Sequence, residues 1–155
     1  ITYKGKTGFS VLSSQSASYY DFKTAFKINE NFNVKLNAHK ADFGVDDAST
    51  GQQWTDSQVA LVGLGAEGFT SFTAYPQLKI YDTLSWGLRL EYMMLDDEAD
   101  TTVFTPTMTV RYSVGDLTII PELRVDRASE ALFRNYRNNP DNFNAAFTLA
   151  AVYSF

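Results

Sequence analysis

Apolar and polar side chains alternate with a period of two along most of the chain, and residues 145–155 show this pattern most clearly. The odd-numbered positions of this stretch are apolar and end in Tyr153 and Phe155, whereas the even-numbered positions are smaller or more polar. Successive side chains of a β-strand point to opposite faces, so this period predicts one long strand with an apolar and a more polar face. An apolar face that ends in aromatic residues is typical of a strand that faces lipid.

The same alternation recurs in earlier segments. It covers residues 18–28, 32–39, 71–80, 84–92, 104–112 and 117–126, and a weaker version covers residues 2–13. Short turns at 29–31, 81–83 and 113–116 alternate with longer connections at 42–67, 95–102 and 127–144, and the connection at 13–17 is the weakest of the series. Residues 59–67 are assigned to a loop, because a further strand there would break the series. The pattern therefore predicts eight antiparallel strands with tight periplasmic turns and long outer loops.

The predicted fold class is all-β, an antiparallel up-and-down transmembrane β-barrel that occupies residues 1–155 as one domain. A lipocalin-like soluble barrel would show the same alternation, but strands of about eleven residues are long enough to cross a bilayer at a tilt. Aromatic residues also lie near the strand ends, where membrane barrels carry their aromatic girdles. The predicted girdle residues are Tyr20, Phe26, Phe32, Tyr92, Phe104, Tyr112, Tyr153 and Phe155. The chain is either a complete eight-stranded barrel or the C-terminal part of a larger one.

Three prolines, Pro76, Pro106 and Pro121, lie inside predicted strands on the apolar face. Proline has no backbone N–H, and a closed barrel has no free edge strand where the loss would not matter. Each proline is therefore expected either to leave one acceptor of a neighbouring strand unpaired or to require a β-bulge.

Composition narrows the class further. The chain has no Cys, which excludes a disulfide framework and thiol chemistry. No apolar run approaches the roughly 18 residues that a transmembrane helix needs. A net charge of -5 argues against a nucleic-acid partner. The first residues lack the basic and apolar regions of a signal peptide, so an exported protein is expected to be represented here in mature or truncated form.

The polar face gathers charges of both signs on consecutive strands, where side chains of neighbouring strands can pair. The predicted inward-facing charged network consists of Arg89, Glu91, Arg111, Glu122, Arg124 and Asp126. Other predicted inward-facing residues are Lys23, Lys27, Lys35, His39 and Lys79. In an eight-stranded barrel these side chains would fill the interior as a structural plug. In a larger barrel the same side chains would line an aqueous channel and set its field.

Other candidate chemistry in the sequence is weak. His39 is the only histidine, and a hydrolase would require a nucleophile beside it, so a residue of the inner wall or rim is the favoured interpretation. The acidic loop with Asp96, Asp97, Glu98 and Asp100 offers oxygen ligands for Ca²⁺, but it lacks the spacing of a calcium-binding loop and is interpreted as a solvated surface. No catalytic residue, metal site or cofactor is therefore predicted.

Three stretches resemble a known family. They are residues 88–92 (LRLEY) followed by Asp96 and Asp97, residues 117–126 (LTIIPELRVD), and residues 147–155 (FTLAAVYSF). They are similar to strands of the β-barrel porin-2, OmpL-like family of Gram-negative bacteria, especially Bacteroidota. Members of this family are usually more than twice as long as this chain, and the proline of the second stretch is shared with them.

The resemblance implies an outer-membrane porin, not an enzyme, that lets small polar solutes diffuse passively. The alternative is a non-conducting accessory barrel packed against a larger outer-membrane complex. The predicted partners are outer-membrane lipid, lipopolysaccharide and the barrel-assembly machinery. The arginines of the last long loop, Arg127, Arg134 and Arg137, would contact lipopolysaccharide phosphates. The terminal aromatic residue, Phe155, resembles the signal that the assembly machinery recognises.

Overall fold

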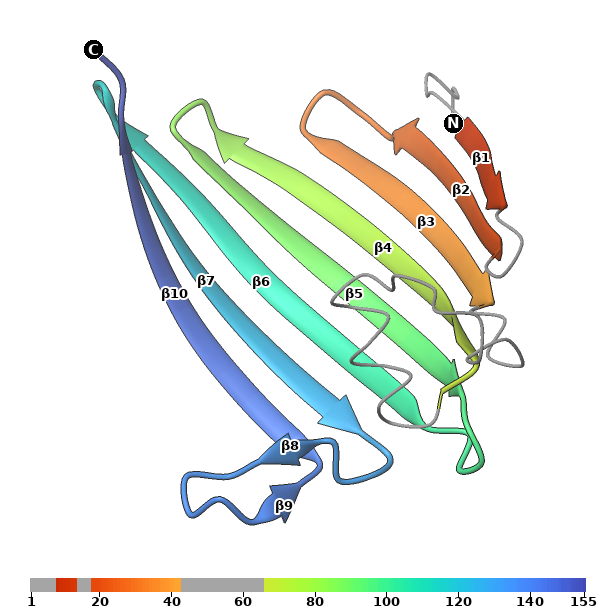
Figure 1. Ribbon diagram of the computed structural model, residues 1–155. Coiled ribbons are helices and arrows are strands. Elements are labelled where there is room, and N and C mark those ends of the chain that lie inside the picture. The colour runs from red at the N-terminus through yellow and green to blue at the C-terminus, as the bar shows by residue number, and fades with distance from the viewer. Residues whose placement is uncertain (1–7, 14–17, 43–65) are drawn as a thin grey trace.

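A computed structural model of the protein describes residues 8–13, 18–42 and 66–155, and these form one large antiparallel sheet (Figure 1). The strand order is β1-β2-β3-β4-β5-β6-β7-β10, which is the up-and-down order of the sequence. The bounds are β1 Gly8–Ser13, β2 Ser18–Lys27, β3 Phe32–Asp42, β4 Gly68–Tyr81, β5 Leu84–Asp96, β6 Thr102–Val114, β7 Leu117–Ala128 and β10 Phe143–Tyr153. Two further strands, β8 (Phe133–Arg134) and β9 (Pro140–Asp141), form a small hairpin in the last long connection. The prediction of eight antiparallel strands is confirmed.

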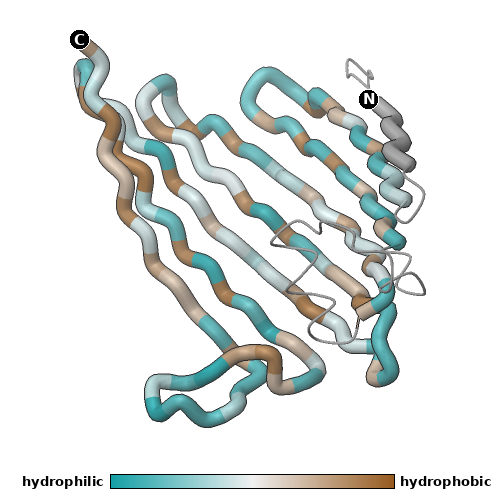
Figure 2. The backbone as a smooth tube through the Cα atoms, in the orientation of Figure 1, coloured by the Kyte–Doolittle hydropathy of each residue, from teal (hydrophilic) through white to brown (hydrophobic). Residues whose placement is uncertain are grey.

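The strand register keeps the two faces of the sheet chemically distinct. Cross-strand partners such as Leu36, Ala74 and Leu90 share the apolar face. Apolar side chains remain exposed on that face, for example Phe72 at 52%, whereas Thr107 on the polar face is 5% exposed. Hydropathy accordingly alternates along much of β2 to β7, whereas β10 is apolar over most of its length (Figure 2). Exposed apolar groups on one face and buried polar groups on the other reverse the arrangement of a soluble protein and match a wall between lipid and a polar interior.

The strands extend further into the three predicted long loops than the alternation indicated. β3 continues to Asp42, β5 continues to Asp96, β6 begins at Thr102 and β7 continues to Ala128. The predicted loop boundaries at 42–67, 95–102 and 127–144 are therefore wrong by one to two residues at these strand ends. The reason is a buried apolar cluster on the inner face at the loop end. It consists of Ala41, Leu95, Val103 and Ala128. These residues carry apolar side chains on the otherwise polar parity, which ends the alternation before the strand itself ends.

Local chemistry explains the turns. The Asn29 side-chain oxygen accepts the N–H groups of Asn31 at 2.9 Å and Phe32 at 2.8 Å, which closes the β2–β3 connection as an Asx turn. Gly115 adopts a φ of 56° between β6 and β7, a left-handed conformation that favours glycine. At Gly68 a Cβ atom would lie 2.3 Å from the carbonyl oxygen of Ala41, so the close approach of β3 and β4 requires glycine there.

The two ends of the sheet are β1 and β10. Within the part of the chain that the structure describes, β10 pairs with β7 and β1 pairs with β2. All eleven residues of β10 are exposed, because this strand has a neighbour on one side. Of residues 59–67, which the sequence assigns to a loop, Ala66 and Glu67 precede β4 and belong to no strand, and residues 59–65 lie outside the described residues.

The three prolines interrupt the ladder without shifting its register. Between β4 and β5 the paired positions skip Pro76, and between β6 and β7 they skip Pro106 and Pro121. The same register continues on both sides of each gap, because the numbers of the two paired residues add up to the same value before and after it. No bulge therefore forms at the prolines. Each proline thus lacks one N–H that the neighbouring strand would accept, which is the first of the two predicted outcomes.

Restoring one of these N–H groups should stabilise the sheet. In Pro106→Val, the new N–H would face the carbonyl of Val125, its register partner on β7. The free energy of unfolding is expected to rise by about 0.5–1.5 kcal/mol, the net value of one hydrogen bond. Denaturant titration in phospholipid vesicles measures this change. A decrease in stability would mean that proline rigidity outweighs the missing hydrogen bond.

Candidate functional site

Strands β5 and β7 carry the same pattern, an arginine followed two positions later by an acid. The register aligns the two copies across β6, because Thr107 pairs with both Arg89 and Arg124. Thr105 pairs with Glu91 in the next row, and the same β6–β7 register places Asp126 opposite Thr105 on the other side. Residues i and i+2 of a strand share a face, so each arginine lies beside its own acid. Two arginine–acid pairs therefore lie at the same level of the polar face, one on β5 and one on β7, with β6 between them.

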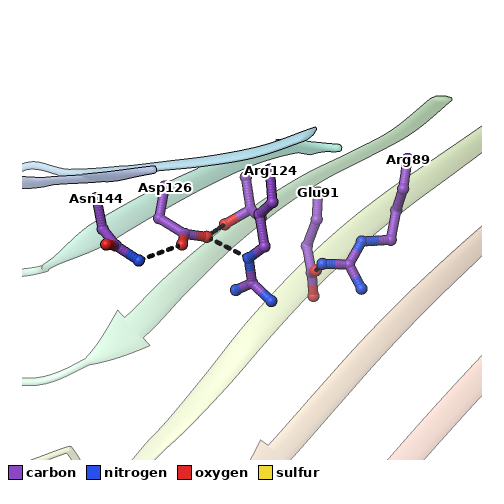
Figure 3. A network of polar contacts seen from close by, with 6 residues as sticks. Arg89, Glu91, Arg124, Asp126 and Asn144 are labelled. Atoms are coloured by element: carbon purple, nitrogen blue, oxygen red, sulfur yellow. Dashed lines mark hydrogen bonds and ion pairs between the residues drawn. The ribbon is translucent and has the colours of Figure 1, made fainter. Parts of the chain in front are cut away.

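Asp126 is the centre of the more extensive pair (Figure 3). It is 4% exposed, and its Oδ1 accepts hydrogen bonds from Thr105 Oγ1 at 2.9 Å and Arg124 Nε at 2.8 Å. Its Oδ2 accepts a hydrogen bond from Asn144 Nδ2 at 3.1 Å. One carboxylate thus links β6, β7 and β10 and satisfies its own buried charge.

Side-chain hydrogen bonds join β6 and β7 where the prolines interrupt their backbone ladder. Besides Thr105–Asp126, Thr109 donates to Glu122 Oε2 at 2.9 Å, and the Ser113 and Thr118 hydroxyls are 2.9 Å apart. These side-chain contacts join β6 and β7 on the inner face, where Pro106 and Pro121 interrupt the backbone hydrogen bonds between the same two strands. They give a physical account of how the sheet tolerates two prolines between one pair of strands.

The predicted charged network divides into separate groups. Arg89 and Glu91 lie 3.5 Å apart between Nη2 and Oε2, a looser pair than Arg124–Asp126. Glu122 is bonded to Thr109, and Arg111 has no carboxylate within 4.0 Å among the described residues. The six predicted residues thus share one face, but they do not form one connected network.

The other predicted inward-facing residues lie on the same face. Lys23 pairs with Asp21 at 2.5 Å, and Lys79 pairs with Asp82 at 2.5 Å in the turn after β4. Lys27 and Lys35 have no carboxylate within salt-bridge distance in the described part of the chain. The polar face of β2 to β7 carries seven Lys and Arg but four Asp and Glu. This face is therefore net positive, although the net charge of the whole chain is -5. The cations are Lys23, Lys27, Lys35, Lys79, Arg89, Arg111 and Arg124, and the acids are Asp21, Glu91, Glu122 and Asp126.

His39 is held by polar neighbours through both ring nitrogens. Nδ1 contacts the Tyr19 hydroxyl and lies 3.1 Å from Asp21 Oδ1, and Nε2 lies 2.6 Å from the Asn37 amide. Ser71 pairs with His39 in the β-ladder, but the ring nitrogens contact Tyr19, Asp21 and Asn37 instead of its hydroxyl. The geometry supports a structural role for His39 in the wall, because a nucleophile must reach both its base and the substrate.

A hollow of about 570 Å³ opens on the polar face beside these pairs. Its polar and charged lining comprises Asn33, Tyr75, Gln77, Lys79, Ser85, Arg89, Thr107, Thr109, Arg111, Glu122 and Arg124. A space of this size holds a small solute, and its many polar groups suit a hydrated one.

The predicted girdle residues lie on the apolar face or at its margin. Tyr20, Tyr92, Phe104, Tyr112 and Tyr153 are exposed at 42–63%, and Phe155 lies beyond the end of β10. Phe26 and Phe32 are half-buried near the β2–β3 turn. The sequence analysis missed part of one aromatic row that crosses the sheet near the loop ends. In register order this row is Phe22, Ala38, Phe72, Tyr92, Phe104, Arg127 and Phe143.

The acidic loop between β5 and β6 is closed by one of its own carboxylates. Asp97 Oδ1 accepts the backbone N–H of Thr101 at 2.7 Å, and Asp100 adopts a left-handed φ of 49° inside the turn. This hydrogen bond lowers the pKa of Asp97 below its ordinary value. Among the described residues, no group of three or more His, Cys, Asp or Glu is arranged to hold a metal ion.

The order of this loop should depend on pH. Because the pKa of Asp97 is lowered in the folded state, its contribution to stability is complete above the ordinary Asp pKa of about 4 and is lost as the pH falls through the lower folded value. Amide exchange at Thr101 is therefore expected to accelerate below this range, after correction for intrinsic rates. In Asp97→Ala the protection should be low at every pH. A pH-independent protection factor in the unmodified chain would contradict this assignment.

A curved antiparallel sheet that is apolar outside, polar inside and connected by alternating tight turns and longer loops is the wall of a membrane-spanning porin-type β-barrel. The described residues contain no helix of the length and apolar character needed to cross a membrane. The family model described as "Putative beta-barrel porin-2, OmpL-like" matches residues 1–155, and the chain belongs to this family. Neither the curated proteins nor the solved structures include a significant match to it. The family places the chain in a membrane in a porin-like role.

Proposed function

We propose that this chain forms the wall of a pore in the bacterial outer membrane through which small polar solutes diffuse passively. The observation that carries the proposal is the hollow of about 570 Å³ on the polar face. Its lining of hydroxyl, amide and charged groups lies opposite an exposed apolar face, so lipid on one side and water on the other satisfy both surfaces.

Planar-bilayer recording tests this function. The folded chain, inserted into a lipid bilayer, is expected to produce discrete conductance steps in 1 M KCl. The heat-unfolded chain at the same concentration serves as the control for detergent leakage. Folded, inserted protein that produces no steps would rule out passive diffusion through this chain.

A second candidate is a non-conducting accessory barrel. The observation that favours it is the ion pairing of Arg89 with Glu91 and of Arg124 with Asp126, which neutralises part of the inner wall as a structural plug would. In this case bilayer insertion without conductance is expected, together with co-purification of a larger membrane complex from native membranes.

The proposed surroundings follow from the outer face. Arg127 lies between Phe104 and Phe143 in the aromatic row near the loop ends, where a cation could contact lipopolysaccharide phosphate. Arg134 donates to the carbonyl of Asn138, and Arg137 lies 5.1 Å from the ring centre of Tyr136, so both are engaged within the last loop. Recognition of Phe155 by the barrel-assembly machinery stays a prediction.

A further inference from the structure

The charge of the hollow is strongly one-sided. Its lining includes four cations, Lys79, Arg89, Arg111 and Arg124, and one carboxylate, Glu122. Glu122 already accepts a hydrogen bond from Thr109 at 2.9 Å. Positive charge in a concave site with protein walls attracts anions more strongly than the same charge on an open surface.

Two donors on the wall of this hollow lack partners. Thr107 is 5% exposed, and its Oγ1 is buried without a hydrogen-bond partner among the described residues. The Nε of Arg89 is also buried without a partner in this part of the chain. The register makes Thr107 the direct neighbour of Arg89 on one side and Arg124 on the other. Buried polar groups are normally hydrogen-bonded, so an unpaired hydroxyl between two arginines indicates a place for an acceptor.

The acids of the two arginine–acid pairs do not occupy this place. Glu91 and Asp126 lie in the next row toward the loops, so each draws its arginine in that direction. Figure 3 shows Arg124 bonded to Asp126 through Nε, while the two terminal nitrogens of its guanidinium point away from that carboxylate. Arg111, two rows toward the turns, has no carboxylate within salt-bridge distance among the described residues. Guanidinium groups with free N–H donors match the oxygens of carboxylate and phosphate.

We propose that Thr107, Arg89, Arg111 and Arg124 form a binding subsite for an oxyanion, the carboxylate or phosphate group of a small solute. The proposal rests on the proposed function in one respect, since it makes the diffusing solutes anionic. The Thr107 hydroxyl and Arg89 Nε donate to the oxyanion from the wall, and Arg111 and Arg124 supply the compensating charge.

Calorimetric titration tests the subsite without requiring conduction. The full chain, refolded in a neutral maltoside detergent that carries no phosphate, is titrated at low chloride with inorganic phosphate and separately with sodium acetate. At least one of the two anions is expected to bind, and its identity shows whether the subsite prefers a tetrahedral or a planar oxyanion. Binding should weaken about tenfold in Arg111→Gln, the loss expected for one charge-assisted contact. Lys40→Gln, which removes an exposed cation on the opposite face of the sheet, is the control and should bind like the unmodified chain.

Thr107→Val tests whether the Thr107 hydroxyl donates to the ligand or has no hydrogen-bond partner in the bound state either. The two side chains have nearly the same shape, so the sheet should fold and lose only the donor. If Thr107 donates to the oxyanion, affinity falls about fivefold or more. No binding of either anion to the unmodified chain, or equal affinity in the unmodified chain, Arg111→Gln and Thr107→Val, would overturn the proposal.

Reversal potentials in a KCl gradient separate this inference from the proposed function. A conducting chain that prefers anions, with the preference reduced in Arg111→Gln, supports both. Conductance without anion binding would support the proposed pore and contradict the oxyanion subsite. Anion binding without conductance would support the subsite and contradict passive diffusion through this chain.

Discussion

Arginine in place of Met108 is expected to lower the free energy of unfolding by about 2–4 kcal/mol, the cost of a cation on the lipid face of a barrel at mid-bilayer. Met108 lies at the centre of β6, on the apolar face, and is exposed there. It pairs with Leu88 on one side and Leu123 on the other, so no carboxylate is available to the new charge in this row. Urea unfolding in phospholipid vesicles, followed by tryptophan fluorescence, measures the change.

Thr109→Arg is the matched control for Met108→Arg. It lies on the same strand, but it faces the polar side and lies opposite Glu122. An arginine there gains a carboxylate neighbour and remains in the hydrated hollow, so the stability should change by less than about 1 kcal/mol. If both variants lost the same stability, or if Thr109→Arg lost more, the assignment of the two faces to lipid and pore would be wrong.

Asp126→Ala is the second variant expected to have a large effect. It removes the acceptor of three side chains, and it leaves the Thr105 hydroxyl and Arg124 without their partner on the inner wall. Buried donors that lose their acceptor cost about 1–3 kcal/mol, and a broken buried ion pair costs more. Because Arg124 remains half-exposed and hydrated, a loss of about 2–4 kcal/mol is expected, measured by the same unfolding experiment.

Two comparisons give this prediction its specificity. Glu130→Ala removes an exposed acid from the following loop and should leave stability unchanged. Pro106→Val restores a backbone N–H between β6 and β7, so it should reduce the loss caused by Asp126→Ala when the two changes are combined. Strict additivity of the two changes would show that the side-chain bonds of Asp126 do not compensate for the interrupted ladder.

Much of the wall could be predicted from local sequence. Asn29 and Gly115 mark tight turns, and the apolar parity from Tyr20 to Phe147 identifies the outward face, because a strand must direct alternate side chains to opposite sides. The misplaced strand ends at the loops share one cause. Leu95 and Val103 break the alternation, and a single-residue pattern cannot distinguish the end of a strand from an apolar cluster on its polar face.

The candidate site was predicted only as a set of residues. The sequence predicts that Arg89, Arg111 and Arg124 lie on the polar face, but it does not show which acid each one contacts. Arg124 is joined to Asp126 and lies beside Thr107, whereas Arg111 has no carboxylate partner among the described residues. Such relations join residues that are far apart in the chain, so the lengths of the turns and the register of three strands decide them.

By itself, the sequence determined the strands, their two faces and the family, because these follow from side-chain alternation, turn chemistry and recurrent strand motifs. Only the tertiary structure decided that Asp126 links three strands, that the prolines leave gaps without bulges, and that Thr107 lies unpaired between two arginines. The physical reason is that hydrogen bonds and ion pairs act over a few ångströms, and only the register of the assembled sheet brings these groups within that range.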